Sequence, residues 1–312
     1  MNPDITERLE QRLGKLYAHQ RLRVETDADV QVFGGGLNFF HIENWYPAQS
    51  LIRNTLKIIG LYSRGVKNTA QVQLRHNALT LAGLPPSFAG FTILHISDMH
   101  VDMNRGATHR LIELLHDIDY DICVLTGDYR GDTFGSFEET LRGMAEVRAH
   151  LGDEVYGVLG NHDSIRMVPE LEDMGIRMLL NESVAIQRAA AQIHLVGLDD
   201  AHYFRVDDIE KASAVVPQDG FSVLLSHTPE IYHRAAHANF NLLLSGHTHG
   251  GQICLPGRIP ILLDSHLPRC MGSGPWVYRN LAGYTSVGVG SSVVPVRFNC
   301  PPEITLHHLH PA

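Results

Sequence analysis

Cysteine is scarce in this sequence. Four cysteines occur among 312 residues, at positions 123, 254, 270 and 300, and no two have the C-x-x-C spacing. This pattern argues against a disulfide framework and against a zinc ribbon. Cys123 lies in the apolar run DICVLTGD, which is typical of a buried free thiol. We therefore expect a reducing compartment, the cytoplasm.

Long apolar runs are also missing. No stretch of 18 uncharged apolar residues occurs, which argues against a membrane-spanning helix. The first residues, MNPDITERLEQRLGKL, are too charged for a secretory signal. The sequence thus predicts a protein that is soluble or lies on a membrane surface.

Basic residues are fewer than acidic ones, 25 Lys and Arg against 34 Asp and Glu, which gives a net charge of −9. Proteins that bind nucleic acid by neutralising phosphates are usually basic, so a nuclease or another nucleic-acid partner is disfavoured. Hydrophobic residues make up 44% of the chain, which excludes a mainly disordered protein. A chain of this length can bury a full core.

The pattern along the chain predicts an α/β fold. Short apolar runs alternate with helical patterns over residues 108–118 and 137–151, as expected for strands and helices in layers. The runs are FTILHISDMH, YDICVLTGDY, EVYGVLGNHD, QIHLVGLDD, FSVLLSHTP and NLLLSGHTHG. Residues 1–88 lack this alternation and contain helix-like stretches. We expect an N-terminal helical extension over residues 1–88 and a separate domain over residues 89–312.

Side chains able to bind metal follow five of these runs. Because active sites collect at the carboxyl ends of parallel strands, we expect these side chains to meet. They are Asp98, His100, Asp128, Asn161, His227, His247 and His249. Oxygen and imidazole donors without thiolate suit Mn²⁺, Fe²⁺, Zn²⁺ or Ni²⁺. The set exceeds the needs of one tetrahedral zinc, and with one shared carboxylate it fits two divalent ions.

The same residues form motifs of a known superfamily. The motifs are Asp98-x-His100, Gly127-Asp128, Gly160-Asn161-His162-Asp163, Ser226-His227 and Gly246-His247-Thr248-His249. Together, and in this order, they resemble the five signatures of the calcineurin-like metallophosphoesterases over about residues 90–310. The resemblance implies a four-layer α/β/β/α sandwich and a metal-dependent phosphoesterase.

The resemblance also implies a role for each residue. Asp98, His100 and His249 would hold one ion, Asn161, His227 and His247 the other, and Asp128 would bridge them. A bridging hydroxide would attack phosphorus in line. His162 would act near the leaving group as an acid or charge stabiliser.

The sequence departs from the family at one position. Some relatives carry a second acid three residues after the bridging aspartate, where it orients the catalytic histidine. Gly131 stands there in this chain. Asp132 or Asp163 remains a candidate for orienting His162. Arg130 is a candidate contact for a substrate phosphate, and a solvated loop arginine is the alternative.

Residues 48–67 form an amphipathic helical pattern. Arg53, Lys57, Arg64 and Lys67 fall within about 80° on a helical wheel, and apolar residues occupy the opposite arc. A basic amphipathic helix is typical of contact with a membrane surface. The alternative is a helix whose apolar face packs on the main domain, and a helix that does both would line an entry for acyl chains.

The substrate is left open by these motifs. The GHTHGGQI form resembles a bacterial subfamily that includes membrane-associated phosphodiesterases and UDP-2,3-diacylglucosamine pyrophosphatases. We therefore expect hydrolysis of a phosphodiester or pyrophosphate, with a nucleotide-linked lipid as one candidate and the inner face of a membrane as one location. The alternatives are a phosphomonoesterase or protein phosphatase, and a membrane-recruited binding module without catalysis. Specificity is expected to lie in residues 25–67, 199–211 and 264–280.

Overall fold

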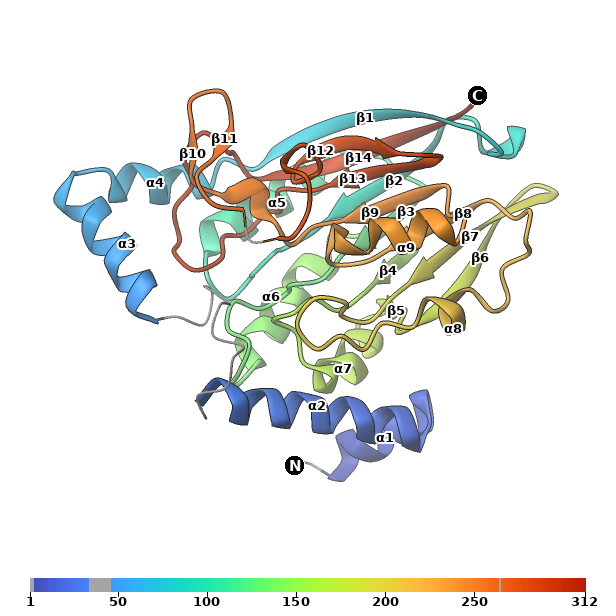
Figure 1. Cartoon of the computed structure of the whole chain (residues 1–312), viewed down its shortest axis with the longest axis horizontal. Helices are drawn as coiled ribbons and strands as arrows, with labels where there is room; N and C mark the ends of the chain where they lie inside the picture. Colours follow the sequence, from blue (N-terminus) through green and yellow to red (C-terminus); the bar gives the residue numbers. More distant parts are fainter. Residues whose placement is uncertain (1–2, 34–45, 264) are drawn as a thin grey trace.

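The computed structural model describes residues 3–33, 46–263 and 265–312 (Figure 1). The helices are α1 (Pro3–Leu13), α2 (Lys15–Phe33), α3 (Tyr46–Ile58), α4 (Tyr62–Thr69), α5 (Arg105–Leu115), α6 (Glu138–Arg148), α7 (Val168–Asp173), α8 (Ile209–Ser213) and α9 (Tyr232–His237). No helix within the described ranges has the length and apolar character needed to cross a membrane.

Two six-stranded sheets form the centre of the protein. Sheet I has the order β1-β14-β2-β3-β4-β5 and sheet II the order β12-β13-β9-β8-β7-β6. The strands of sheet I are β1 (Gln73–Leu81), β14 (Glu303–Pro311), β2 (Phe91–Ile96), β3 (Ile122–Leu125), β4 (Val155–Gly157) and β5 (Arg177–Met178). Those of sheet II are β12 (Gly274–Tyr278), β13 (Leu281–Thr285), β9 (Leu242–Ser245), β8 (Ser222–Leu225), β7 (Ala191–Gly197) and β6 (Glu182–Arg188). A separate antiparallel hairpin joins β10 (Cys254–Leu255) to β11 (Ile259–Pro260).

The strands that precede the predicted ligands run parallel to one another. In sheet I, β2, β3 and β4 pair in parallel, and in sheet II, β8 and β9 do. These strands are short and buried on both faces, which explains their uninterrupted apolar sequences. All six apolar runs of the sequence form strands, as predicted.

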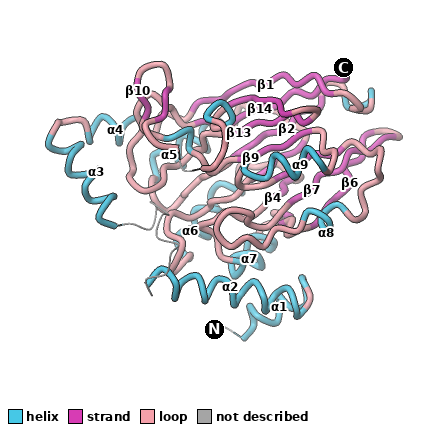
Figure 2. The backbone as a smooth tube through the Cα atoms, viewed as in Figure 1, coloured by secondary structure: helices cyan, strands magenta, loops and turns pink. Residues whose placement is uncertain are grey.

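The core consists of three apolar layers, so the architecture is α/β/β/α. One cluster lies between sheet I and helices α5, α6 and α7, and includes Leu111 and Met144. A second lies between the two sheets, and a third lies between sheet II and helices α8 and α9. Figure 2 shows the helices outside the paired sheets. The predicted four-layer sandwich is confirmed.

Helix α2 is fixed to the domain by buried charges. The guanidinium of Arg21 is fully buried and donates to the Asp199 carboxylate at 3.0 Å. The Glu25 carboxylate accepts from the backbone N–H of Ile165 at 2.6 Å. Ile165 lies just after the Asn161–Asp163 loop, so α2 covers the chain that leaves that loop.

The division at residue 88 remains a prediction. The strand β1 lies on the N-terminal side of that position, and it pairs in parallel with β14 over nine residues, from Gln73 with Glu303 to Leu81 with Pro311. Sheet I therefore includes residues from both predicted segments.

The amphipathic stretch 48–67 forms two helices instead of one. Helix α3 ends at Ile58, and α4 begins at Tyr62. Gly60 between them has φ 73°, and the N–H groups of Gly60 and Leu61 donate to the carbonyls of Lys57 and Leu56. This is a Schellman end, which needs a left-handed residue and so favours glycine. The single helical wheel therefore applies only as far as Ile58.

Candidate metal centre

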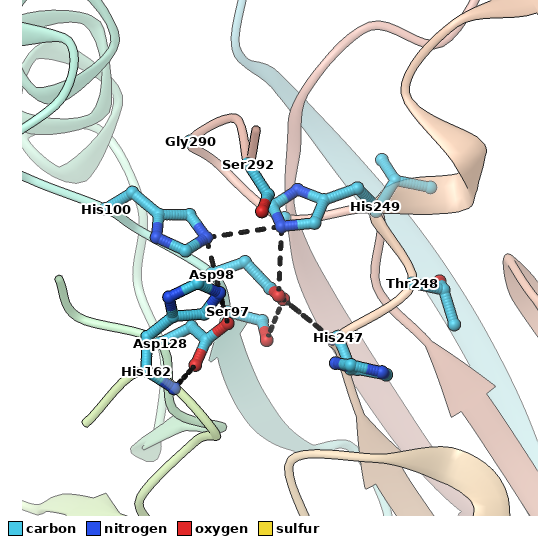
Figure 3. Close-up of polar contacts among 12 residues, drawn as sticks. Ser97, Asp98, His100, Asp128, His162, His247, Thr248, His249, Gly290 and Ser292 are labelled. Carbon is cyan, nitrogen blue, oxygen red and sulfur yellow. Dashed lines mark hydrogen bonds and ion pairs between the residues drawn. The ribbon is translucent and has the colours of Figure 1, made fainter. Parts of the chain in front are cut away.

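Five strands deliver the predicted residues to one place. Asp98 and His100 follow β2, Asp128 follows β3, and Asn161 and His162 follow β4. From sheet II, His227 follows β8, and His247 and His249 follow β9. All eight side chains are at least 95% buried. The ends of both sheets thus converge, and Figure 3 shows the side chains of Asp98, His100, Asp128 and His249 pointing toward one another.

The backbone at five of these positions is in the left-handed region. The φ angles are 49° at Asp98, 40° at His100, 55° at Asp128, 70° at His247 and 48° at His249. Such a conformation costs about 1–3 kcal/mol for a residue other than glycine, and it persists only where surrounding contacts enforce it. The turns bend the chain sharply at the strand ends. As a result, residues two positions apart, such as Asp98 and His100 or His247 and His249, direct their side chains to the same centre.

One group of ligand atoms gathers around Asp98 and His249. One donor atom from each of Asp98, His100, Asp128 and His249 lies within 4.8 Å of the others. The Nε2 atoms of His100 and His249 are 3.2 Å apart, and His249 Nε2 is 3.4 Å from Asp98 Oδ1. These are the residues that the sequence assigns to the first ion and to the bridge.

A second group gathers around Asn161. Its Oδ1 atom lies 2.8 Å from His227 Nε2 and 3.0 Å from His247 Nδ1. His227 Nε2 is 3.3 Å from Asp128 Oδ2, and His100 Nε2 is 3.8 Å from the same oxygen. Asp128 therefore lies between the two groups, and its role as a bridge between two ions remains a prediction.

Backbone carbonyls orient two of the imidazoles. His100 Nδ1 lies 2.6 Å from the Arg130 carbonyl, and His227 Nδ1 lies 2.8 Å from the Thr126 carbonyl. Because a carbonyl only accepts, each Nδ1 carries the proton, and a neutral ring then presents its Nε2 lone pair to the centre. This is the usual arrangement for histidines that bind metal.

Burial and neighbouring carboxylates shift the pKa values of the groups at this site. Burial lowers the pKa of His100 to about 4 and raises the pKa of Asp98 to about 6. Burial also works against protonation of His227, yet the adjacent Asp128 carboxylate raises its pKa to about 10. A neutral His100 keeps a ring lone pair that can bind a cation, and the Asp128 carboxylate that raises the His227 pKa would also attract a cation.

The donor set fits divalent ions. Donors about 2.1 Å from one ion lie roughly 3.0–3.4 Å apart at ordinary coordination angles. The His100–His249, His249–Asp98 and His247–Asn161 distances fall in this range. The two groups share Asp128, and their occupation by two ions remains a prediction.

The remaining predicted residues lie around this centre. His162 Nε2 is 3.9 Å from Asp128 Oδ2, and its backbone N–H donates to Asp128 Oδ1 at 3.0 Å. Its Nδ1 lies 3.2 Å from the Thr133 hydroxyl. The Asp163 carboxylate accepts three backbone N–H groups, from Asp128, Tyr129 and Gly160. Asp163 thus ties the β3 loop to the β4 loop.

Arg130 is buried and not a solvated loop residue. Its Nε donates to the carbonyl of Asp132. It lines a cavity of about 310 Å³ together with Glu25, Thr133 and Arg166. Contact with a substrate phosphate, and an orienting role for Asp132 or Asp163, remain predictions.

Two residues outside the motifs lie against the donor groups: Arg297, which was not predicted, and His202, which lies in the predicted specificity segment 199–211. The Arg297 guanidinium is fully buried behind His249, 3.2 Å from its Nδ1, and donates to the carbonyls of Val287 and Gly290. The His202 ring contacts the His247 ring, with centroids 4.1 Å apart and the ring planes tilted by 48°. Neither belongs to a motif, and only their position in the fold brings them here. Of the predicted specificity segments, residues 34–45 and 264 lie outside the described residues.

Comparison with known proteins agrees with this geometry. The sequence profile of the calcineurin-like phosphoesterase family matches residues 91–251, which contain all eight converging residues. The chain belongs to this family. It is accordingly a metal-dependent phosphoesterase with a buried Asp/His site for a divalent ion.

Several relatives span most of this phosphoesterase. The chain is 29% identical to the uncharacterized metallophosphoesterase YkoQ of Bacillus subtilis, over 78% of this chain and 92% of YkoQ. It is 28% identical to phosphodiesterase YaeI of Escherichia coli, over 76% of this chain and 87% of YaeI.

Other similarities are partial. The chain is 30% identical to a transmembrane protein with metallophosphoesterase domain of Bos taurus, over 71% of this chain and about half (53%) of that protein. Among solved structures, calcineurin-like phosphoesterase YfkN of Bacillus subtilis aligns with a TM-score of 0.44 at 14% identity, over 64% of this chain and 82% of that one.

Proposed function

We propose that this phosphoesterase hydrolyses phosphodiester or pyrophosphate bonds with two divalent ions. The observation that carries the proposal is the position of Asp128 between two groups of donors, one from Asp98, His100 and His249 and the other from Asn161, His227 and His247. The similarity to phosphodiesterase YaeI supports a diester as substrate.

The ions would neutralise charge on the phosphoryl oxygens and lower the pKa of a water molecule. Asp128 would contribute one ligand to each of the two donor groups. The carbonyls of Arg130 and Thr126 would keep His100 and His227 in the metal-binding tautomer. Since the protein mainly positions groups and neutralises charge in phosphoryl transfer, a rigid and buried site is what the reaction needs.

His162 is proposed to act at the leaving group. Its Nε2 lies 3.9 Å from Asp128 Oδ2, beside the donor groups and outside the four-residue cluster of Asp98, His100, Asp128 and His249. Thr133 contacts its Nδ1 and would fix the ring plane. From this position His162 would deliver a proton to the departing oxygen.

The finer substrate predictions remain proposals. A nucleotide-linked lipid such as UDP-2,3-diacylglucosamine is one candidate, with contact to the inner face of a membrane through residues 48–67. The helix α3 in this stretch has both a packed side, at Ile52 and Leu56, and exposed apolar residues, at Leu51 and Ile58. Packing on the domain therefore leaves apolar side chains available to a lipid.

The test compares initial rates on bis-p-nitrophenyl phosphate and on p-nitrophenyl phosphate, each with Mn²⁺ and with EDTA. We expect faster hydrolysis of the diester, and EDTA should abolish it. Faster hydrolysis of the monoester would favour the phosphomonoesterase or protein phosphatase alternative instead. A diester rate that survives EDTA after dialysis would contradict the metal-dependent site.

A further inference from the structure

An apolar groove leads directly into the candidate metal centre. It has a volume of about 440 Å³ and lies between helix α3, the β10–β11 region and the loop at residues 292–294. Leu56 and Ile253 contribute aliphatic walls, and His247 and His249 line the same groove. An apolar channel that reaches metal-binding residues is unusual for an enzyme whose reaction concerns only a charged phosphate.

The wall formed by α3 is held in place by packing. Leu56 is buried against Val294 and Val296, and Ile52 packs on the same cluster. The groove is therefore built into the fold, because the α3 side chains that line it also anchor the helix.

The mouth of the groove is flanked by exposed apolar side chains. Twelve large hydrophobic residues are exposed in the described part of the chain, and eight of them lie in residues 51–61 or 255–262. Leu51 on α3 is 69% exposed, and Ile261 on the opposite side is 59% exposed. Both also line the groove. Concentrated exposed apolar surface of this kind marks a binding or membrane-contact site.

The charge around the mouth is positive although the whole chain is acidic. Residues 46–69 contain Arg53, Lys57, Arg64 and Lys67 and no acidic residue, and the turn between β10 and β11 carries Arg258. Figure 1 shows α3, α4 and this hairpin at the same end of the molecule. Apolar side chains beside basic ones match a lipid surface with anionic headgroups.

We propose that this groove binds the hydrocarbon chain of a lipid phosphoester, with the phosphoryl group at His247 and His249. The inference rests on the proposed function, since it places a substrate in the same site. A single substrate molecule would then extend from the donor groups, which bind its phosphate, to the mouth of the groove, which holds its hydrocarbon chain. The apolar residues at the mouth would face the lipid surface from which the chain enters.

The test measures kcat/KM on a series of alkyl p-nitrophenyl phosphodiesters with methyl, butyl, octyl and dodecyl chains, each below its critical micelle concentration and with Mn²⁺. We expect kcat/KM to rise with chain length, by up to about fourfold for each fully buried methylene. Thr55→Trp, which narrows the groove, and Ile261→Asp, which charges its mouth, should both flatten this rise. The matched control is Val277→Asp, because Val277 is 70% exposed on β12, outside the groove.

The outcomes separate the two proposals. No metal-dependent turnover of bis-p-nitrophenyl phosphate would refute the proposed function. Turnover of that substrate together with a flat chain-length profile would refute the groove assignment alone. A rise that persists unchanged in both groove variants, with circular dichroism showing that they are folded, would also refute it.

Discussion

At the scale of single residues, Asp128 has the position that most constrains the chemistry. Its carboxylate lies between the two donor groups, while its backbone N–H donates to Asp163. His162 contacts the same carboxylate region but has a different environment, beside the Thr133 hydroxyl. Substitution of these two residues should therefore have different effects on metal content.

We expect Asp128→Asn to lose bound metal and activity together, because the bridging charge is removed. His162→Ala should retain two ions per chain and lose about 10²–10⁴-fold in kcat, as is typical when a general acid is removed. Metal content by inductively coupled plasma mass spectrometry, measured beside kcat, distinguishes the two. If His162→Ala lost its metal, His162 would be a ligand, and if Asp128→Asn kept two ions, the bridge assignment would be wrong.

The sequence predicts the positions of the donors but not their supports. Each donor follows an apolar run, and the carboxyl ends of parallel strands share an edge, so convergence could be inferred without coordinates. Arg297 could not be placed in this way, since its contact with His249 spans 48 positions and depends on the irregular loop after β13. Thr133 was missed because a lone threonine in a loop carries no pattern.

At the scale of elements, the close approach of the two sheets requires glycine. A Cβ atom at Gly246, just after β9, would overlap the side chains of Ser97 and Asp98, which follow β2 in the other sheet. The His247 N–H donates to Asp98 Oδ1 at 2.9 Å across the same junction. The spacing of the sheets at this point therefore determines where Asp98 lies.

We expect Gly246→Ala to lower metal occupancy and to reduce the free energy of unfolding by about 1–3 kcal/mol, the usual cost of overpacking. Gly152→Ala is the matched control, because the nearest atom to an added Cβ there is 3.7 Å away. Urea titration gives the stability and mass spectrometry the metal content. If Gly246→Ala changed stability and metal content as little as Gly152→Ala, the junction would tolerate a methyl group.

At the scale of the whole molecule, most of the exposed large hydrophobic residues lie at one end, in residues 51–61 and 255–262, beside the basic residues of α3 and α4. The fold class and layer order could be predicted from strand and helix periodicity and from the resemblance. The apolar groove could not be predicted from the sequence. It is formed by α3 and the β10–β11 region, which are about 200 residues apart in the chain. The break at Gly60 was also missed, since a helical wheel assumes a continuous helix.

We expect the protein to float with phosphatidylglycerol vesicles and to bind pure phosphatidylcholine vesicles weakly, because each Lys or Arg near an anionic surface contributes about 1 kcal/mol. Ile58→Asp should lower the bound fraction by about tenfold, since Ile58 is 85% exposed beside Lys57. Leu16→Asp is the control, because Leu16 is 84% exposed on α2. Equal binding by wild type and both variants would argue against contact through α3.

The placement of β14 has a consequence for biosynthesis. This strand lies inside sheet I between β1 and β2, and its partner in β1 precedes it by 230 positions, from Gln73 to Glu303. While the ribosome is still translating, the facing edges of β1 and β2 therefore have no partner. Unpaired edges of this kind favour aggregation, and contacts so distant in sequence form slowly. Folding of this sheet is thus expected to finish only after residue 311 has left the exit tunnel, and chaperones that shield nascent chains should increase its yield.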